Sequence, residues 1–387
     1  MKYFSTRDKS KSRPFSLAEA AFAGLAPDGG LFMPERIPMV DMAVVEAEAE
    51  KSYADMALYL AGLLFDDVPK ADLERVVRDA YDFPIELNQI AENLSTLELF
   101  HGPTYAFKDF GARFMGRMTG LLNEGGPLTI LTATSGDTGS AVAHGFYGVE
   151  GVRVVILYPE GKVSPLQEAQ MTTLGGNIYP LRVKGNFDDC QHLVKSMFRN
   201  EELRAQVRIT SANSINLLRW IPQSFYYFYA YCQWKKVTGM DHPTVVVPSG
   251  NYGNLAAGMF AKRMGLPIKD FVAASNANDV VPEYLKTGYY RPRASVRTVA
   301  NAMDVGAPSN FERMLWLCED SYANMCDEIK GFSCSDQQIL DAISEIYDQL
   351  QEKRKHSDNS ALMAQINEIV DYVESQNKKR MLVEDIQ

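Results

Sequence analysis

The stretch that decides the fold is LELFHGPTYAFKDFGARF, residues 97–114. At its centre, Lys108 follows the apolar and aromatic run Tyr105–Phe107 and precedes Asp109. An amine next to buried aromatic side chains loses hydration, which favours its neutral, nucleophilic form. The alternative is an ordinary lysine at the start of a helix, with its stem packed on an aromatic ring and its charge in water. Taken alone, the stretch favours the ordinary lysine, with Asp109 as an acid favoured by the helix dipole.

Two glycine-rich stretches later in the chain reverse that judgement. The first, TATSGDTGS at 132–140, follows the strand-like run 128–131, and the second, PSGNYGN at 248–254, follows the strand-like run 244–247. A strand, a glycine-rich turn and a helix N-terminus make an anion site, because glycines let backbone N–H groups approach a phosphate closely. A nucleophilic lysine beside such sites suits pyridoxal phosphate, so Lys108 is predicted to form a Schiff base with that cofactor.

Five motifs in order resemble the threonine synthases, pyridoxal-phosphate enzymes of the tryptophan-synthase-β-like fold (fold type II). They are LFHGPT with FKD at 99–109, SGDTG at 135–139, SANSIN at 211–216, SGNYGN at 249–254 and NAMDVG at 301–306. The resemblance covers residues 1–345. It implies an α/β fold of largely parallel sheets covered by helices, with a small N-terminal domain and a helical C-terminal tail.

The resemblance implies a carbon–oxygen lyase acting on phosphate, which converts O-phospho-L-homoserine and water to L-threonine and phosphate in threonine biosynthesis. Lys108 would be the catalytic residue, binding the cofactor and then acting as acid and base at Cα and Cβ. An amino-acid dehydratase or phospho-lyase on the same fold is a second possibility, because it would use the same lysine. A third is a scaffold that binds the cofactor without turnover.

The resemblance also assigns three groups of binding residues, and it assigns no metal ligand. The residues that would bind the cofactor phosphate are Gly250, Asn251, Tyr252, Gly253 and Asn254. Those that would bind the substrate carboxylate are Ser135, Gly136, Asp137, Thr138 and Gly139. Those that would bind the substrate phosphate are Ser214, Asn216 and Arg219. Each group has a structural alternative. The first loop could be a plain strand-to-helix turn, Ser135 or Thr138 could cap a helix, and Arg219 could be a surface cation.

Composition limits the partners of the chain. It has 387 residues and a net charge of −10, which disfavours nucleic acid. No apolar run is long enough for a membrane helix, so no membrane partner is expected. Residues 1–14 lack the apolar core of a signal peptide, and the five cysteines are interpreted as free thiols, so we expect a cytoplasmic monomer or homodimer.

The pattern predicts three regions: a small N-terminal domain at 1–95, an α/β catalytic region at 96–345 and a helical, charged tail at 346–387. Expected strands are 128–132, 152–158, 178–183, 207–210, 244–247 and 271–274. Expected helices include 55–65, 72–81, 165–174, 188–199, 217–236 and 255–264.

The end of the chain departs from the resembling family. Two helices are expected from Ser335 onward, separated by the charged run 351–356. The family's partner for the pyridine nitrogen comes from a segment that residues 346–387 do not resemble, so none is assigned. We therefore expect slower turnover than in relatives that have this segment, and an apolar face that the tail either covers or leaves exposed.

Overall fold

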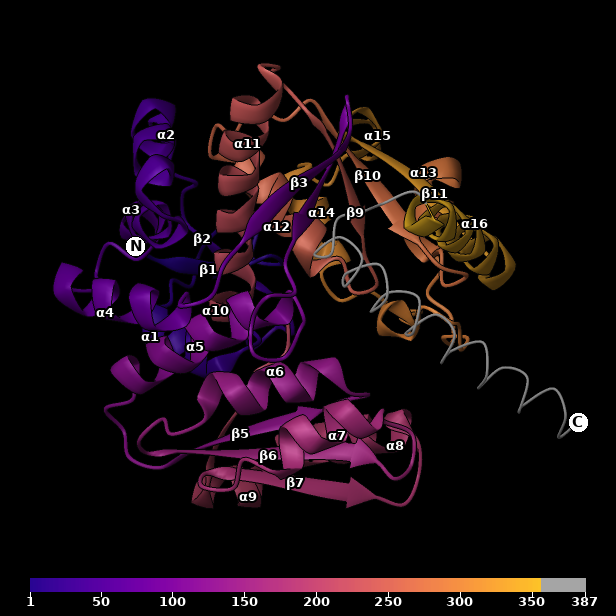
Figure 1. Ribbon diagram of the computed structural model, residues 1–387. Helices are drawn as coiled ribbons and strands as arrows, with labels where there is room; N and C mark the ends of the chain where they lie inside the picture. The colour runs from indigo at the N-terminus through magenta and orange to yellow at the C-terminus, as the bar shows by residue number, and fades with distance from the viewer. Residues whose placement is uncertain (356–387) are drawn as a thin grey trace, which may run out of the picture.

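The computed structural model describes residues 1–355. It contains two parallel sheets with helices between and around them (Figure 1). The larger sheet has the order β7-β6-β5-β8, and every neighbouring pair in it is parallel. Its strands are β5 (Leu128–Ala133), β6 (Val152–Pro159), β7 (Ile178–Val183) and β8 (Arg208–Ser211).

Both faces of this sheet are covered, because successive side chains on a strand point to opposite faces. Ile130 belongs to the core that includes α6 (Asp137–Phe146). Its neighbour Leu131 packs in a second cluster with residues of α8 (Phe187–Arg199). This is the arrangement expected of a parallel sheet buried between helices.

The smaller sheet has the order β11-β10-β9 and is also parallel. Its strands are β9 (Thr244–Pro248), β10 (Asp270–Ser275) and β11 (Ile329–Ser333). Around it lie α12 (Gly253–Arg263), α13 (Val280–Thr287) and α15 (Tyr322–Glu328) (Figure 1). Arg263 at the end of α12 pairs with buried Glu328 at 2.6 Å and so ties α12 to α15.

The central helix α5 (Lys108–Leu122) packs closely on α6 because glycines leave room for the backbones. A Cβ on Gly116 would lie 2.0 Å from the carbonyl oxygen of Gly145, and a Cβ on Gly145 would lie 2.6 Å from that of Ala112. Side chains at these positions would force the helices apart. The aromatic helix α11 (Phe225–Thr238) follows α10 (Leu217–Trp220) and a short 3₁₀ turn.

The N-terminal region is mainly helical. It contains the antiparallel pair β1 (Tyr3–Ser5) and β2 (Phe32–Pro34), the helices α1 (Leu17–Ala23), α2 (Met42–Lys51), α3 (Tyr53–Leu64) and α4 (Lys70–Ala80), and the hairpin of β3 (Glu86–Ala91) and β4 (Leu94–Glu98). Ser16 and Glu19 form a reciprocal capping box at the start of α1.

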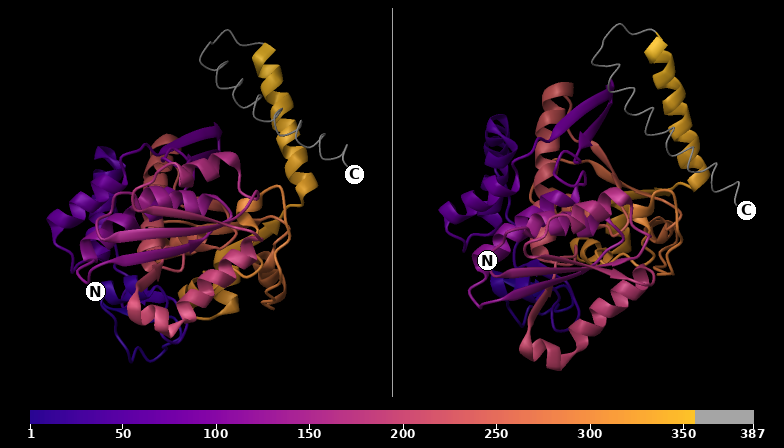
Figure 2. Two further views of the ribbon diagram at one scale, coloured as in Figure 1. Left: turned by 90° about the horizontal axis from the view of Figure 1, so that it is seen from below. Right: turned by 60° about the horizontal axis from the view of Figure 1, so that its bottom comes forward.

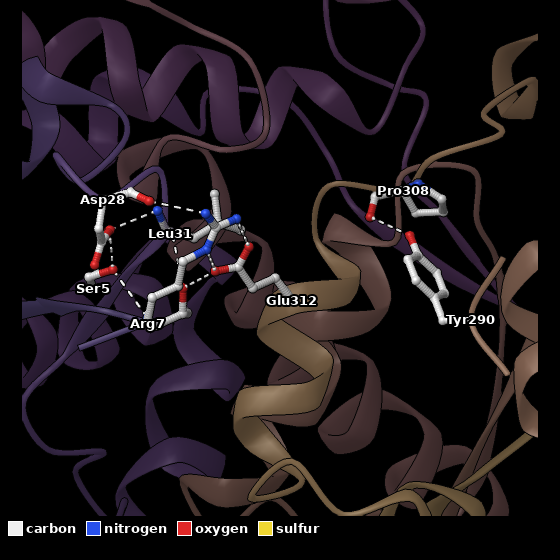
Figure 3. Close-up of polar contacts among 9 residues, drawn as sticks. Ser5, Arg7, Asp28, Leu31, Tyr290, Pro308 and Glu312 are labelled. Carbon is white, nitrogen blue, oxygen red and sulfur yellow. Dashed lines mark hydrogen bonds and ion pairs between the residues drawn. The ribbon is translucent and has the colours of Figure 1, made fainter. Parts of the chain in front are cut away.

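A polar cluster joins the N-terminus to α14 (Phe311–Leu317), far along the chain (Figure 3). Arg7 donates through Nε and a terminal nitrogen to both carboxylate oxygens of Glu312, at 3.1 and 3.0 Å. Its other terminal nitrogen donates to the Asp28 carbonyl at 3.0 Å. On the other side of α14, the Tyr290 hydroxyl donates to the Pro308 carbonyl at 3.4 Å. These contacts tie α14 to the N-terminal segment and the residues before it to Tyr290.

The six predicted strands and the six predicted helices are confirmed within a few residues of their ends, although 217–236 divides into α10, a 3₁₀ turn and α11. Strand β11 and the hairpin of β3 and β4 were not predicted. The charged run 351–356 was predicted to separate two helices. This prediction is wrong for residues 351–355, because α16 (Asp336–Lys355) continues through them. Helix α16 projects from the body of the protein (Figure 2). The expected second helix lies outside the described residues. The division into three regions stays a prediction, with its boundaries inside β4 and α16.

The remaining α-helices in the described part are α7 (Pro165–Thr172) and α9 (Glu201–Gln206), and a second 3₁₀ turn spans Asn301–Met303. All five cysteines are free thiols, as predicted. Within residues 1–355, no helix combines the length and the apolar character that crossing a membrane requires.

Arg113 gives a test of how α5 is held against α4. Its guanidinium is buried and donates to the carbonyls of Asp79 and Ala80, both at 2.8 Å, at the C-terminus of α4. Arg113→Met leaves those carbonyls unpaired and should lower the free energy of unfolding by about 2–3 kcal/mol. Arg36→Met removes only an exposed pair with Asp66 and should cost under about 1 kcal/mol. Urea midpoints compare the two; equal shifts would contradict this role of Arg113.

Candidate active site

Lys108 and Asp137 meet where two helices begin. Lys108 is the first residue of α5 and Asp137 the first residue of α6. The Lys108 Nζ donates to the Asp137 Oδ2 at 2.5 Å, and each side chain is 18% exposed. The sequence thus places a partly accessible amine beside a carboxylate, which is suited to holding and releasing a proton.

The surroundings of Lys108 differ from those expected. The aromatic run before it is not a buried pocket, because Tyr105 is 68% exposed and the ring centre of Phe107 lies 5.9 Å from the Nζ. Tyr105 also takes a left-handed backbone conformation with φ of 57°. The partner that orients Lys108 is Asp137 rather than an aromatic wall.

Asp109 holds the turn that presents Lys108. Its carboxylate accepts hydrogen bonds from the Thr104 backbone N–H at 2.9 Å and from the Thr104 hydroxyl at 2.7 Å. The side chain is fully buried, and burial raises the pKa of Asp109. A Cβ on Gly102 would lie 2.5 Å from the Asp109 Oδ2, so this turn requires glycine there. Asp109 is therefore a structural centre of the turn and more than an acid at a helix start.

The loop before α6 is organised by Thr134, which sequence reasoning did not single out. Its hydroxyl accepts from the N–H groups of Gly136 and Gly139, at 2.9 and 2.8 Å. The structural alternative, a cap by Ser135 or Thr138, is not what the structure has, because the N-cap residue of α6 is Gly136. The N–H groups of Ser135 and Asp137 have no acceptor within residues 1–355. They remain available to an anion.

Arg219 is buried close to Lys108 and Asp137. It is 3% exposed, and a terminal nitrogen donates to the Ala212 carbonyl at 2.7 Å. Its Nε is buried without an acceptor among the described residues. Burial lowers the pKa of Arg219 to about 10, an effect that the charges of Asp109 and Asp137 oppose. The alternative of a surface cation is thus wrong.

Asn216, another predicted binding residue, is occupied inside the protein. It is fully buried and caps α10, accepting from the Leu218 N–H at 3.0 Å. Its amide nitrogen donates to the carbonyls of Ala21 at 2.7 Å and Ser211 at 3.3 Å. The side chain is occupied within the protein, and it anchors the loop that carries Ser214.

Residues Gly250–Asn254, here called the amide loop, lead from β9 into α12. None of its five backbone N–H groups has an acceptor within residues 1–355. Tyr252 adopts φ of 59° at the N-cap, with its ring buried and its hydroxyl 2.5 Å from that of Ser275. Unpaired N–H groups at the start of an 11-residue helix are a strong anion site.

Side chains lock the amide loop from both ends. The Asn254 Oδ1 accepts from the Ser249 hydroxyl at 2.7 Å, and its amide nitrogen donates to the Pro248 carbonyl at 2.8 Å. The Asn251 amide nitrogen donates to the Ser214 hydroxyl at 2.6 Å, which brings two of the predicted groups together. Arg219 donates to the Ala212 carbonyl on the same loop as Ser214, so this loop connects Arg219 to the amide loop.

Ser309, Asn310 and Arg313, near the start of α14, also contact this site and were not predicted. Ser309 binds the Asn251 amide oxygen, and Asn310 donates to the Ser214 hydroxyl at 3.1 Å. The sequence offered only a weak signal, since asparagine is a common residue at the N-cap of a helix.

Known proteins share this arrangement. A sequence profile described as "Pyridoxal-phosphate dependent enzyme" matches residues 85–351, and one described as "Threonine synthase N terminus" matches residues 2–81. Threonine synthase from Haemophilus influenzae is 49% identical over 79% of this chain and 72% of its own. The crystal structure of threonine synthase from Escherichia coli superposes with a TM-score of 0.82 at 41% identity, over 90% of this chain and 81% of its own.

The chain belongs to the threonine synthase family. It is therefore a pyridoxal-phosphate enzyme of fold type II, and the predicted fold class is confirmed. A structure described as PLP-bound threonine synthase from Brucella melitensis is similar to it, with a TM-score of 0.80 and 36% identity over 87% of this chain and 79% of its own. The residues present fit the cofactor, because the amide loop offers unpaired N–H groups to a phosphate and Lys108 offers an accessible amine.

Gly250 tests whether the amide loop holds the cofactor phosphate. A Cβ at this position would lie 2.7 Å from the Met303 Cα, so Gly250→Ala must displace the loop. We expect pyridoxal phosphate affinity to fall about ten-fold or more, with larger losses for Gly250→Val or Gly253→Val. Gly62→Ala, where a Cβ meets no atom within 4 Å, should leave affinity unchanged. Unchanged affinity in the loop variants, measured by absorbance titration, would place the phosphate elsewhere.

Proposed function

We propose that this chain converts O-phospho-L-homoserine and water to L-threonine and inorganic phosphate. The observation that carries the proposal is the 2.5 Å contact between Lys108 and Asp137 beside a buried arginine with an unpaired Nε. The substrate has a carboxylate and a phosphate, in addition to the phosphate of the cofactor. A site for these three anions needs three sets of donors, and the described chain offers the loop before α6, Arg219 and the amide loop.

The cofactor and the Lys108 side chain have different roles in the proposed reaction. Bound pyridoxal phosphate supplies an electron sink for negative charge that develops next to the amino nitrogen. The amide loop holds its phosphate through the N–H groups of Gly250–Asn254. The Lys108 amine removes and returns protons at Cα and Cβ, which lets phosphate leave from Cγ and water add at Cβ. Asp137 orients the amine and stabilises its protonated form between transfers.

Arg219 provides the positive charge that an anionic substrate requires in a protein of net charge −10. A buried guanidinium with an unpaired Nε gains a charge-assisted hydrogen bond when a phosphate or carboxylate binds. The free N–H groups of Ser135 and Asp137 would receive the substrate carboxylate. Gly136, Thr138 and Gly139, whose own N–H groups are already bonded, would shape this loop around it. Asn216 would act by positioning the Ser214 loop, since its own amide is already paired.

The substrate of this enzyme family is a small molecule. A cytoplasmic location, a monomeric or homodimeric state and the exclusion of nucleic acid stay predictions. The proposed slower turnover concerns residues 346–387, most of which lie outside the described residues.

A product assay tests the proposed reaction. Purified protein loaded with pyridoxal phosphate and given O-phospho-L-homoserine should release threonine and phosphate in equal amounts. Lys108→Ala should abolish both products, because no other described amine contacts Asp137, whereas exposed Lys162→Ala should keep wild-type turnover. Phosphate with 2-oxobutyrate and no threonine would indicate the dehydratase or phospho-lyase alternative. Bound cofactor without phosphate release would indicate the inactive scaffold.

A further inference from the structure

Helix α16 carries an apolar stripe that the described part of the chain leaves exposed. Ile339, Ile343 and Ile346 are spaced four and three residues apart, so they lie on one face of the helix. Ile343 is 39% exposed and Ile346 is 56% exposed, and none of the three packs in a hydrophobic cluster of residues 1–355. The helix is tied to the body at its first residue, where the Val299 backbone N–H donates to the Asp336 Oδ1 at 3.1 Å, and it then projects away (Figure 2).

An exposed stripe of this kind needs a partner. A single helix of this length is marginally stable in water, and most of the stability of a helix comes from packing its apolar face. Helix α16 has 20 residues and projects from the body, so the body does not supply that packing for the stripe. Another surface must therefore cover Ile343 and Ile346.

The sequence of α16 extends the stripe in both directions. Six positions follow one another at intervals of three, four, three, four and three residues. These are the a and d positions of a heptad repeat, through which two helices pack in a coiled coil. In chain order they are occupied by Asp336, Ile339, Ile343, Ile346, Leu350 and Lys353. This row thus has an acid at its start, four apolar residues in the middle and a base at its end.

The row is complementary to itself when it is reversed. When two copies lie antiparallel about a twofold axis, residue i of one copy faces residue j of the other, and residue j of the first faces residue i of the second. In that pairing Asp336 faces Lys353 of the second copy at both ends, and Ile343 faces Ile346 at the centre. A parallel pair would place Asp336 on Asp336 and Lys353 on Lys353, and like charges at facing positions are unfavourable. The charges therefore select the antiparallel arrangement.

The residues beside the row are compatible with this pairing. Leu340 and Tyr347 occupy the e positions of the same heptads, which border the row and widen its apolar surface. Asp341 and Glu345 are exposed and occupy positions f and c, on the other side of the helix. The contact surface between the two ends of the row is thus uncharged.

We propose that two copies of this chain associate through α16, with the two helices antiparallel and the stripe of each copy packed on that of the other. A second copy is favoured as the occupant because the row is complementary to itself in both its apolar residues and its end charges. Residues 356–387 of the same chain, or an unrelated protein, are the competing occupants, and in either case the purified chain would be monomeric. The inference uses no residue of the candidate active site, so it stands apart from the proposed reaction.

Sedimentation velocity of the full chain over a series of concentrations measures the dissociation constant Kd of the dimer. Ile343→Lys puts a charge at the centre of both stripes and should raise Kd about 100-fold or more, because the buried isoleucine is lost twice. Ser344→Lys is the matched control: Ser344 is exposed, and its hydroxyl donates to the Leu340 carbonyl of its own helix at 2.9 Å. It adds the same charge outside the row and should leave Kd unchanged. Thermal unfolding of both variants checks that the body of the protein is intact.

A charge swap tests the direction of the helices. Asp336→Lys and Lys353→Asp each place like charges at both ends of the dimer and should raise Kd about five-fold or more. The double variant restores opposite charges in the antiparallel arrangement alone, so its Kd should lie below that of Asp336→Lys and close to that of the wild type. Asp336→Lys also loses the hydrogen bond from Val299, but the double variant loses it too, so comparing these two isolates the charge pair.

A dimer that Ile343→Lys weakens and that the double variant restores supports the inference. A wild-type chain that stays monomeric at about 100 μM overturns it, because a Kd in the micromolar range would show a dimer at that concentration. A dimer that persists in Ile343→Lys also overturns it, since the contact would then lie on another surface. A double variant no tighter than Asp336→Lys would contradict the antiparallel pairing.

Discussion

The contact between the Lys108 ammonium and the Asp137 carboxylate resolves a conflict in the fold. A cation at the first position of a helix is unfavourable, because the N-terminus of a helix carries partial positive charge. Lys108 occupies that position in α5. Asp137 begins α6, where an acid is favoured, and it contacts the Lys108 Nζ at 2.5 Å. The glycine-packed crossing of α5 and α6 brings the two helices close enough for this pair.

Sites where local preference is violated are often functional. A lysine at the start of a helix lowers the stability of the fold. The hydrogen bonds from Thr104 to Asp109 hold the turn that presents this lysine. Two further cations, Arg219 and Arg313, are removed from water nearby. Burial lowers the pKa of Arg313 to about 9, and neither arginine is paired with a carboxylate at salt-bridge distance in the described part of the chain. Buried charges of this kind are poor stabilisers, which favours a role in holding loops and anions.

Much of the fold could be predicted from the sequence. The six central strands are β-branched, short and bounded by turn residues, and their positions follow from that pattern. Strand β11 was not predicted, because its sequence IKGFS has neither alternating apolar and polar residues nor a run of β-branched residues. Its pairing with β10 is decided by tertiary contacts. The two glycine loops were recognisable because each follows a strand and precedes a helix, a purely local signal.

Only the parts of the site that lie within one short stretch of sequence were predictable. Lys108 and the amide loop lie in recognisable motifs, but the carboxylate that contacts Lys108 comes from 29 residues away. Arg313 lies 99 residues from Ser214, and nothing in the residues around it marks it as buried. Thr134 and Asn310 act through side-chain hydrogen bonds to groups elsewhere in the fold, which leave no periodicity in the sequence. Long-range polar contacts of this kind require the folded chain.

The most direct measurement maps the lysine that carries the cofactor. Protein loaded with pyridoxal phosphate is reduced with borohydride, digested and analysed by mass spectrometry, so that the cofactor stays attached to the lysine it had bound. A single modified peptide with the cofactor on Lys108 is expected. A reduced adduct on any other lysine, with Lys108 unmodified, would contradict it.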